Sequence, residues 1–386
     1  MTGARPLPLG SAIGILGGGQ LGQMTAVAAR RLGYRSVVLD PDPASPAAQV
    51  ADQLIQGSLE DRASIEAMAQ HAAVVTYEFE NVSADAVAAL AERVPVHPSS
   101  DILKTSQHRL REKAAVVRLG GQVPPFAAVG SPADLEAALS SLRLPVVIKT
   151  ATGGYDGKGQ AVARTAAEAR AAVVQLLQVC DTLIAEEQVD LALELSVICA
   201  RDQQGRLATY PAAENRHVHG ILDVSSTPAR ASGAVLGRAD AVARQVATGL
   251  GLVGVMAVEM FVDQQGRVLV NEIAPRPHNS GHHTIEASAT SQFEQLVRMV
   301  AGLPLGDTRV ARPAAMANLL GDWWGPDGTP PDVARMLAVP GVSLHLYGKA
   351  AARPGRKMGH LTAVGDTVED AVARVLKARG DRPPTA

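Results

Sequence analysis

The stretch Val258–Ile273 has the sequence VEMFVDQQGRVLVNEI, two apolar runs separated by a polar turn at Asp263–Gly266. Runs of this kind around a glycine-containing turn predict a β-hairpin. With the turn placed there, Glu259 is expected opposite Val270, and Glu272 two residues further along the same face. Two carboxylates on one face can hold Mg²⁺ together, because this ion prefers oxygen ligands. The hairpin therefore predicts a magnesium site formed by Glu259 and Glu272.

Asn271 precedes Glu272 directly and points to the opposite face in an ideal strand. A role beside Glu272 would therefore require a twist at the end of the strand. The alternative for Glu259 is an exposed strand position. Its neighbours Val258 and Met260 are apolar, however, and burying an unpaired carboxylate is costly, so a partner is expected.

The segment after the hairpin, APRPHNSGHHT at 274–284, concentrates hydrogen-bond donors. Cationic and neutral donors beside a metal site suit a small oxyanion under attack. Three histidines could also indicate a transition-metal site, but the adjacent glutamates favour magnesium. The donors in question are Arg276, His278, Asn279, His282 and His283.

A glycine-rich loop, KTATGGYDGKGQ at 149–160, follows the apolar run LPVVIK and precedes a second short run, QAVA. A loop between two strands is not a Walker A loop, which opens a helix and ends in Gly-Lys-Ser/Thr. It suits a flap whose backbone amides fold over triphosphate oxygens, with Lys149 and Lys158 supplying positive charge. A plain glycine hairpin is the alternative.

The N-terminal region alternates apolar runs with helical stretches, which predicts a βαβαβ unit and a parallel sheet. Gly17, Gly19 and Gly22 form a G-x-G-x-x-G turn after the first run, and Asp40 ends the next. This pattern is typical of NAD-binding units, but a helix N-terminus favours any phosphate. A tight turn without a ligand is the third interpretation.

Length and composition limit the class of protein. A chain of 386 residues indicates two or three domains, at roughly 150 residues each. Lysine and arginine total 36 against 38 acidic residues, so no basic excess favours nucleic acid. Two cysteines, Cys180 and Cys199, and no apolar run of roughly 18 residues predict a cytoplasmic protein outside the membrane.

Three domains are expected: an α/β, Rossmann-like domain at 1–105, an α+β domain at 106–305 and a small domain at 306–386.

Beyond the stretches above, the sequence contains VTYEFENV, AEEQV with ELSVI, YPAAENRHVHGIL, SQFEQ and LYGKAAARPGRKMGH. Taken in order, these motifs resemble the ATP-grasp family over nearly the whole chain. The resemblance implies a three-domain ATP-grasp enzyme, usually a homodimer, that uses ATP and Mg²⁺ to carboxylate aminoimidazole ribonucleotide with bicarbonate.

The same resemblance implies roles for individual residues. Glu194 is expected to hold the ribose of ATP, and Glu259 with Glu272 the magnesium ions. Residues expected to contact ATP are Arg109, Lys149, Gly154, Tyr155, Asp156, Gly157, Lys158, Gly159, Gln160, Glu186, Glu187, Gln188, Val189, Glu194, His217, Asn271 and Glu272.

The remaining implied roles concern the other two substrates. Bicarbonate and the carboxyphosphate oxyanion are expected at Arg276, His278, Asn279 and Lys349. Asp156 is expected near the substrate amine. The substrate itself is expected to contact Gln20, Leu21, Tyr155, Arg356 and Lys357, with the basic pair at its 5′-phosphate. The chain departs from the family at His108, usually acidic, and at His283, usually tryptophan.

Three other functions compete with this interpretation. A formate-using glycinamide ribonucleotide transformylase has the same fold, but GYDGKGQ and RPGRKMGH favour the carboxylating enzyme. An NAD-dependent oxidoreductase would leave the second and third domains unexplained. A non-catalytic nucleotide-binding regulator would bind ATP without turnover, although the metal and oxyanion candidates are intact.

Overall fold

The computed structural model describes residues 5–154, 157–325 and 327–380. Its N-terminal part is a four-stranded parallel sheet in the order β3-β2-β1-β4, as the alternating pattern predicted. The strands are β1 (Ala12–Leu16), β2 (Arg35–Asp40), β3 (Gln53–Gln56) and β4 (Val74–Tyr77), and the helices are α1 (Gln20–Arg31), α2 (Arg62–Ala67) and α3 (Ala84–Ala91). The pattern missed β3, because it is a short edge strand with glutamine at both ends.

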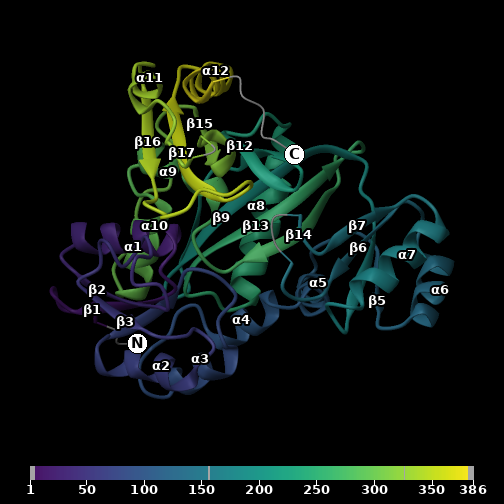
Figure 1. Ribbon diagram of the computed structural model, residues 1–386, viewed down its shortest axis with the longest axis horizontal. Helices are drawn as coiled ribbons and strands as arrows, with labels where there is room; N and C mark the ends of the chain where they lie inside the picture. Colours follow the sequence, from purple (N-terminus) through teal and green to yellow (C-terminus); the bar gives the residue numbers. More distant parts are fainter. Residues whose placement is uncertain (1–4, 155–156, 326, 381–386) are drawn as a thin grey trace.

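Two helices and a small antiparallel sheet come next. The two helices are α4 (Ser100–Ser106) and α5 (Arg109–Arg118). The sheet has the order β5-β8-β6-β7 and forms a lobe with two helices (Figure 1). Its elements are β5 (Phe126–Val129), α6 (Pro132–Ser141), β6 (Val146–Thr150), β7 (Gln160–Ala163), α7 (Ala166–Leu176) and β8 (Leu183–Glu187).

The largest sheet has nine strands and runs from the centre of the molecule into its C-terminal part (Figure 1). Its order is β14-β13-β9-β11-β12-β15-β17-β16, with β10 on β9, so it continues across the boundary expected at residue 305. The strands are β9 (Leu191–Arg201), β10 (Leu207–Thr209), β11 (Ala213–Val218), β12 (Ile221–Thr227), β13 (Gly254–Asp263), β14 (Val268–Ala274), β15 (Ala314–Leu320), β16 (Val342–Leu346) and β17 (Lys357–Val364).

Helices cover this sheet and join it to the N-terminal part. The side chains of α8 (Gly233–Gly249) form one apolar core with β9, β13 and β14. Helix α10 (Gln292–Val300) packs against β13 and also against α1, which brings the first glycine turn next to the large sheet (Figure 1). The short helices α9 (Thr284–Ala287) and α11 (Val333–Leu337) and the final helix α12 (Val368–Arg379) complete the fold.

The β13–β14 hairpin is present, but its predicted register is wrong. Glu259 is paired directly with Glu272, and Met260 is paired with Val270. Asn271 is the extra residue of a β-bulge between these two pairs. The bulge shifts the alternation of side chains by one residue, which a pattern of regular strands cannot reveal.

Candidate active site

A pocket of about 630 Å³ lies where the N-terminal part, the small-sheet lobe and the large sheet, including its strand β17, meet. Its lining combines residues that lie far apart in the sequence, from Gln20 to Lys357. Of the residues predicted from sequence it includes Gln20, Leu21, Arg109, Lys149, Gly154, Gly157, Gln160, Glu194, His217, Glu259, Asn271, Glu272, Arg276, His278, Asn279 and Lys357.

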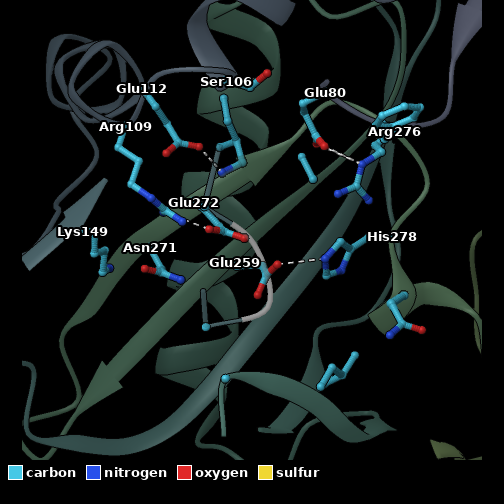
Figure 2. Close-up of a pocket in the computed structure, with 18 of the residues that line it drawn as sticks. Glu80, Ser106, Arg109, Glu112, Lys149, Glu259, Asn271, Glu272, Arg276 and His278 are labelled. Atoms are coloured by element: carbon cyan, nitrogen blue, oxygen red, sulfur yellow. Dashed lines mark hydrogen bonds and ion pairs between the residues drawn. The ribbon is translucent and has the colours of Figure 1, made fainter. Parts of the chain in front are cut away.

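The two hairpin carboxylates lie side by side in this pocket (Figure 2). Nε2 of His278 lies 2.9 Å from Oε1 of Glu259, and Nη1 of Arg109 lies 3.1 Å from Oε2 of Glu272. Burial alone would raise the pKa of Glu259, but the charge of the neighbouring His278 lowers it to about 2. Glu259 is therefore ionised at neutral pH and has the partner that its buried position requires.

The bulge brings Asn271 into the pocket beside Glu272. Two carboxylates and an amide supply oxygen ligands only, which suits Mg²⁺. The described part of the chain holds no group of three or more histidine, cysteine and acidic side chains placed to bind a metal. A pair of carboxylates fits an ion that takes further ligands from phosphate and water.

Lys149 belongs to a buried charge network beneath the small-sheet lobe. Its Nζ donates a hydrogen bond of 2.9 Å to Oε2 of Glu186, and Nζ of Lys113 lies 3.5 Å from Oε1 of the same carboxylate. Burial alone would raise the pKa of Glu186, but these two lysines hold it below its usual value. Glu186 does not line the pocket, so its side chain acts by holding Lys149 there.

Glu194 and His217 face each other on β9 and β11, with Oε2 and Nδ1 2.6 Å apart. Burial would lower the pKa of His217, but Glu194 outweighs burial and raises it. Both residues line the pocket, as do Gly157 and Gly220, the latter in the turn between β11 and β12.

The first glycine turn does not present a free anion site. Glu78, just after β4, accepts hydrogen bonds from the backbone N–H groups of Gly19 and Gly22, the latter at 2.8 Å. Oδ2 of Asp40 accepts one from the N–H of Gly18 at 2.7 Å. The protein's own carboxylates therefore occupy the N-terminus of α1, where a dinucleotide phosphate would bind. This arrangement counts against the NAD interpretation.

Other predicted residues lie at the edge of the pocket or away from it. Arg276 pairs with Glu80 at 2.9 Å and lines the pocket (Figure 2). Nζ of Lys349 donates to the carbonyl oxygen of Lys357 at 2.8 Å. The predicted residues outside the lining are Lys158, Gly159, Glu186, Glu187, Gln188, Val189, Lys349 and Arg356.

Two of these residues, Glu187 and Arg356, have partners outside the pocket. Glu187 pairs with the exposed Arg143 at 2.8 Å. Arg356 donates to the carbonyl oxygen of Ala351 at 2.7 Å. Tyr155, predicted to contact the substrate, and Asp156, predicted near the substrate amine, lie outside the described residues.

The sequence analysis did not assign a role to four ionisable residues near the site. Glu78 and Glu80 follow a parallel strand, where ligands usually bind, and this position was the available signal. Glu112 and Lys113 are buried ionisable residues on α5, and no sequence signal distinguishes them from exposed ones. Burial, together with the nearby Glu272, raises the pKa of Glu112 to about 8, while burial lowers that of Lys113.

The fold and the pocket are those of an ATP-grasp protein. Family models match three successive parts of the chain: a ribonucleotide synthetase preATP-grasp domain at 11–107, an ATP-grasp domain at 114–293 and a phosphoribosylaminoimidazole carboxylase C-terminal domain at 314–374. The described residues include no helix long and apolar enough to cross a membrane.

Individual relatives agree with these matches. N5-carboxyaminoimidazole ribonucleotide synthase of Bacillus subtilis is 44% identical, over 92% of this chain and 91% of its own, and that of Brucella melitensis is 42% identical, over 92% and 96%. A crystal structure of an N5-carboxyaminoimidazole ribonucleotide synthetase with ADP has a TM-score of 0.90 at 42% identity, covering 96% of this chain and 97% of that one. The chain belongs to the N5-carboxyaminoimidazole ribonucleotide synthase family, which confirms the resemblance inferred from its motifs.

One solved relative carries both a nucleotide and a second substrate. The synthase from Aspergillus clavatus, in complex with ADP and 5-aminoimidazole ribonucleotide, has a TM-score of 0.87 at 31% identity. The alignment covers 95% of this chain and 97% of that one.

Proposed function

We propose that this chain carboxylates 5-aminoimidazole ribonucleotide with ATP and bicarbonate, giving N5-carboxyaminoimidazole ribonucleotide, ADP and phosphate in purine biosynthesis. Relatives that align over 92% of the chain carry the name of this activity. The main support for the proposal is that one pocket is lined by the Glu259–Glu272 pair and also by Gln20 of the N-terminal part and Lys357 of β17. One cavity can therefore hold a nucleotide and a second ligand together.

In this mechanism, bicarbonate attacks the γ-phosphorus of ATP, the bond to the β-phosphate oxygen breaks, and ADP and carboxyphosphate form. Arg276, His278 and Asn279 surround the reacting oxyanion with donors, so that positioning and charge neutralisation supply most of the catalysis. Carboxyphosphate then releases CO₂ and phosphate, and the substrate amine captures CO₂ and loses a proton. Capture inside the pocket keeps water away from the reactive species.

Magnesium would be held by Glu259 and Glu272, with Asn271 beside them, and when bound would neutralise charge on the ATP phosphates. Lys149, held by Glu186, and Arg109, held by Glu272, supply fixed positive charge at the same end of the pocket. Glu194 with His217 lies where the ribose hydroxyls of ATP are expected. These assignments extend the family resemblance to individual residues.

The test is ADP release by purified protein, measured with each substrate alone and with all together. The proposal requires release that depends on bicarbonate and aminoimidazole ribonucleotide jointly. Release that needs formate and glycinamide ribonucleotide instead would establish the transformylase alternative. Binding of ATP without turnover under either condition would establish the regulator.

We also propose a cytoplasmic homodimer on the family resemblance, and light scattering after size-exclusion chromatography tests the dimer.

A further inference from the structure

Strand β14 is an edge strand of the nine-stranded sheet, so one side of its backbone has no partner strand. Helix α5 and the segment after it take the place of that strand. The N–H of Val270 donates to the carbonyl oxygen of Gln122 at 2.7 Å, and the carbonyl oxygen of Val270 accepts from Nζ of Lys113 at 3.4 Å. The N–H of Ile273 donates to Oε1 of Glu112 at 2.6 Å.

The spacing of these contacts depends on the bulge. Along a regular strand, every second residue directs its N–H away from the partner strand. Val270 does so, and Ile273, three residues on, would then direct its N–H toward β13. The extra residue Asn271 shifts the alternation by one, and the N–H of Ile273 reaches Glu112 instead. The contact with Glu112 is therefore compatible with the bulged register and not with a regular one.

The bulge also determines what enters the pocket. In a regular strand, Asn271 and Glu272 would lie on opposite faces. In the bulged strand both line the pocket, and Glu272 lies directly opposite Glu259. Glu112 and Lys113 are each almost fully buried, so their contacts with β14 are shielded from water and cannot be replaced by it.

We propose that Glu112 and Lys113 are positioning residues that lock the bulged register of β14 and thereby hold Asn271 and Glu272 together at the metal and phosphate end of the site. This inference rests on the proposed function for its catalytic consequence. Its structural part concerns the protein without ligands and can be tested there. Lys113 contributes a second effect, because its other partner is Glu186, which holds Lys149.

The matched variants are Glu112→Leu, which removes the acceptor at similar volume, and Glu112→Gln, which keeps a carbonyl acceptor for Ile273. Lys113→Met removes the ammonium group at similar length. Arg111→Gln, at an exposed position of the same helix, is the control. Hydrogen–deuterium exchange of the ligand-free proteins, followed on peptides covering 268–274, reports the register of β14 without any assay of activity.

We expect faster exchange at 268–274 in Glu112→Leu, confined to these peptides, and wild-type exchange in Glu112→Gln and Arg111→Gln. Lys113→Met should show the same faster exchange at 268–274, together with faster exchange in the strands that carry Lys149 and Glu186, because Lys113 also pairs with Glu186. In the ADP-release assay, the Mg²⁺ concentration for half-maximal rate should rise roughly 10–100-fold in Glu112→Leu and return toward the wild-type value in Glu112→Gln, as for other groups that orient metal ligands. A general loss of stability would instead accelerate exchange over the whole chain and leave the Mg²⁺ dependence unchanged.

Two results would overturn the proposal: wild-type exchange at 268–274 in Glu112→Leu, or a Glu112→Gln variant as impaired as Glu112→Leu. Should Glu112→Leu not fold, Lys113→Met with Glu112→Gln gives the same comparison of exchange. If wild-type protein shows no joint dependence on bicarbonate and aminoimidazole ribonucleotide, the proposed function fails. The exchange result still decides whether the two residues lock the register.

Discussion

Glu259 on β13 and Glu272 on β14 are direct cross-strand partners, and a different donor holds each carboxylate, His278 for Glu259 and Arg109 for Glu272. Like charges directly opposite each other are unfavourable in a sheet. The two donors offset this repulsion without separating the carboxylates. This arrangement supports the proposed magnesium site at the pair.

Replacing Glu272 by glutamine should abolish turnover while the fold persists. One proposed metal ligand is lost, and Arg109, which is partly exposed, keeps an amide oxygen as a hydrogen-bond partner. We expect ADP release to fall at least about 100-fold, the upper part of the range for disturbed metal sites. Thermal unfolding within a few degrees of wild type is the accompanying control. Activity near the wild-type rate would remove Glu272 from the metal site.

The N-terminus of α1 should not bind NAD, because Glu78 occupies it. Titration of wild-type protein with NADH, followed by its fluorescence, is expected to show no binding at millimolar concentration. Glu78→Ala frees the N–H groups of Gly19 and Gly22 and should lower the free energy of unfolding by about 2 kcal/mol. Denaturant unfolding measures this, with the exposed Asp42→Ala as control. Saturable NADH binding would restore the oxidoreductase interpretation.

Adjacent glutamates on β8 should respond very differently to loss of their partners. Lys149→Met leaves the buried Glu186 with Lys113 alone, and breaking a buried pair is strongly destabilising, here by about 3 kcal/mol. Arg143→Met breaks the pair with Glu187 by removing an exposed arginine and should change the free energy of unfolding by less than about 1 kcal/mol. Urea unfolding of both variants tests the contrast. Equal effects would show that the buried network does not stabilise the lobe.

His283 should make the protein sensitive to acid. It is fully buried, and burial lowers its pKa to about 4 from a usual value near 6.5. The unfolded chain therefore takes up a proton below pH 6.5 that the folded chain refuses until about pH 4. The stability that the neutral, buried His283 contributes is therefore fully present above pH 6.5 and is lost as the pH falls from 6.5 to about 4.

The matched variant is His283→Phe, which keeps an aromatic ring and removes the titrating group. On going from pH 7 to pH 5, the wild-type protein should lose about 2 kcal/mol more of its free energy of unfolding than the variant does. This follows because each unit of difference in the pKa of His283 between the folded and unfolded states is worth about 1.4 kcal/mol. Denaturant unfolding at the two pH values measures the difference. Parallel pH profiles for the two proteins would show that His283 does not contribute.

Much of the fold and of the site was predictable because the signals are local. The alternating runs at 12–79 predicted the parallel sheet, and the apolar pairing around Asp263–Gly266 predicted the hairpin. Loop composition at 149–160 and 274–284 indicated phosphate and oxyanion binding, and the pocket lining includes residues from both. Motifs spread along the chain identified the family.

The same residues do not reveal which backbone groups find partners far away in the chain. The bulge at Asn271 depends on α5, whose Glu112 and Lys113 bind the free edge of β14 more than 150 residues away. The glycine turn at 17–22 fits a dinucleotide site by sequence, but in the folded protein Glu78 accepts hydrogen bonds from its backbone amides. Local pattern specifies strands, turns and the kinds of group available, because these depend on neighbours in sequence. Register and the occupancy of a helix end depend on hydrogen bonds made between distant segments, and only the folded molecule brings those segments together.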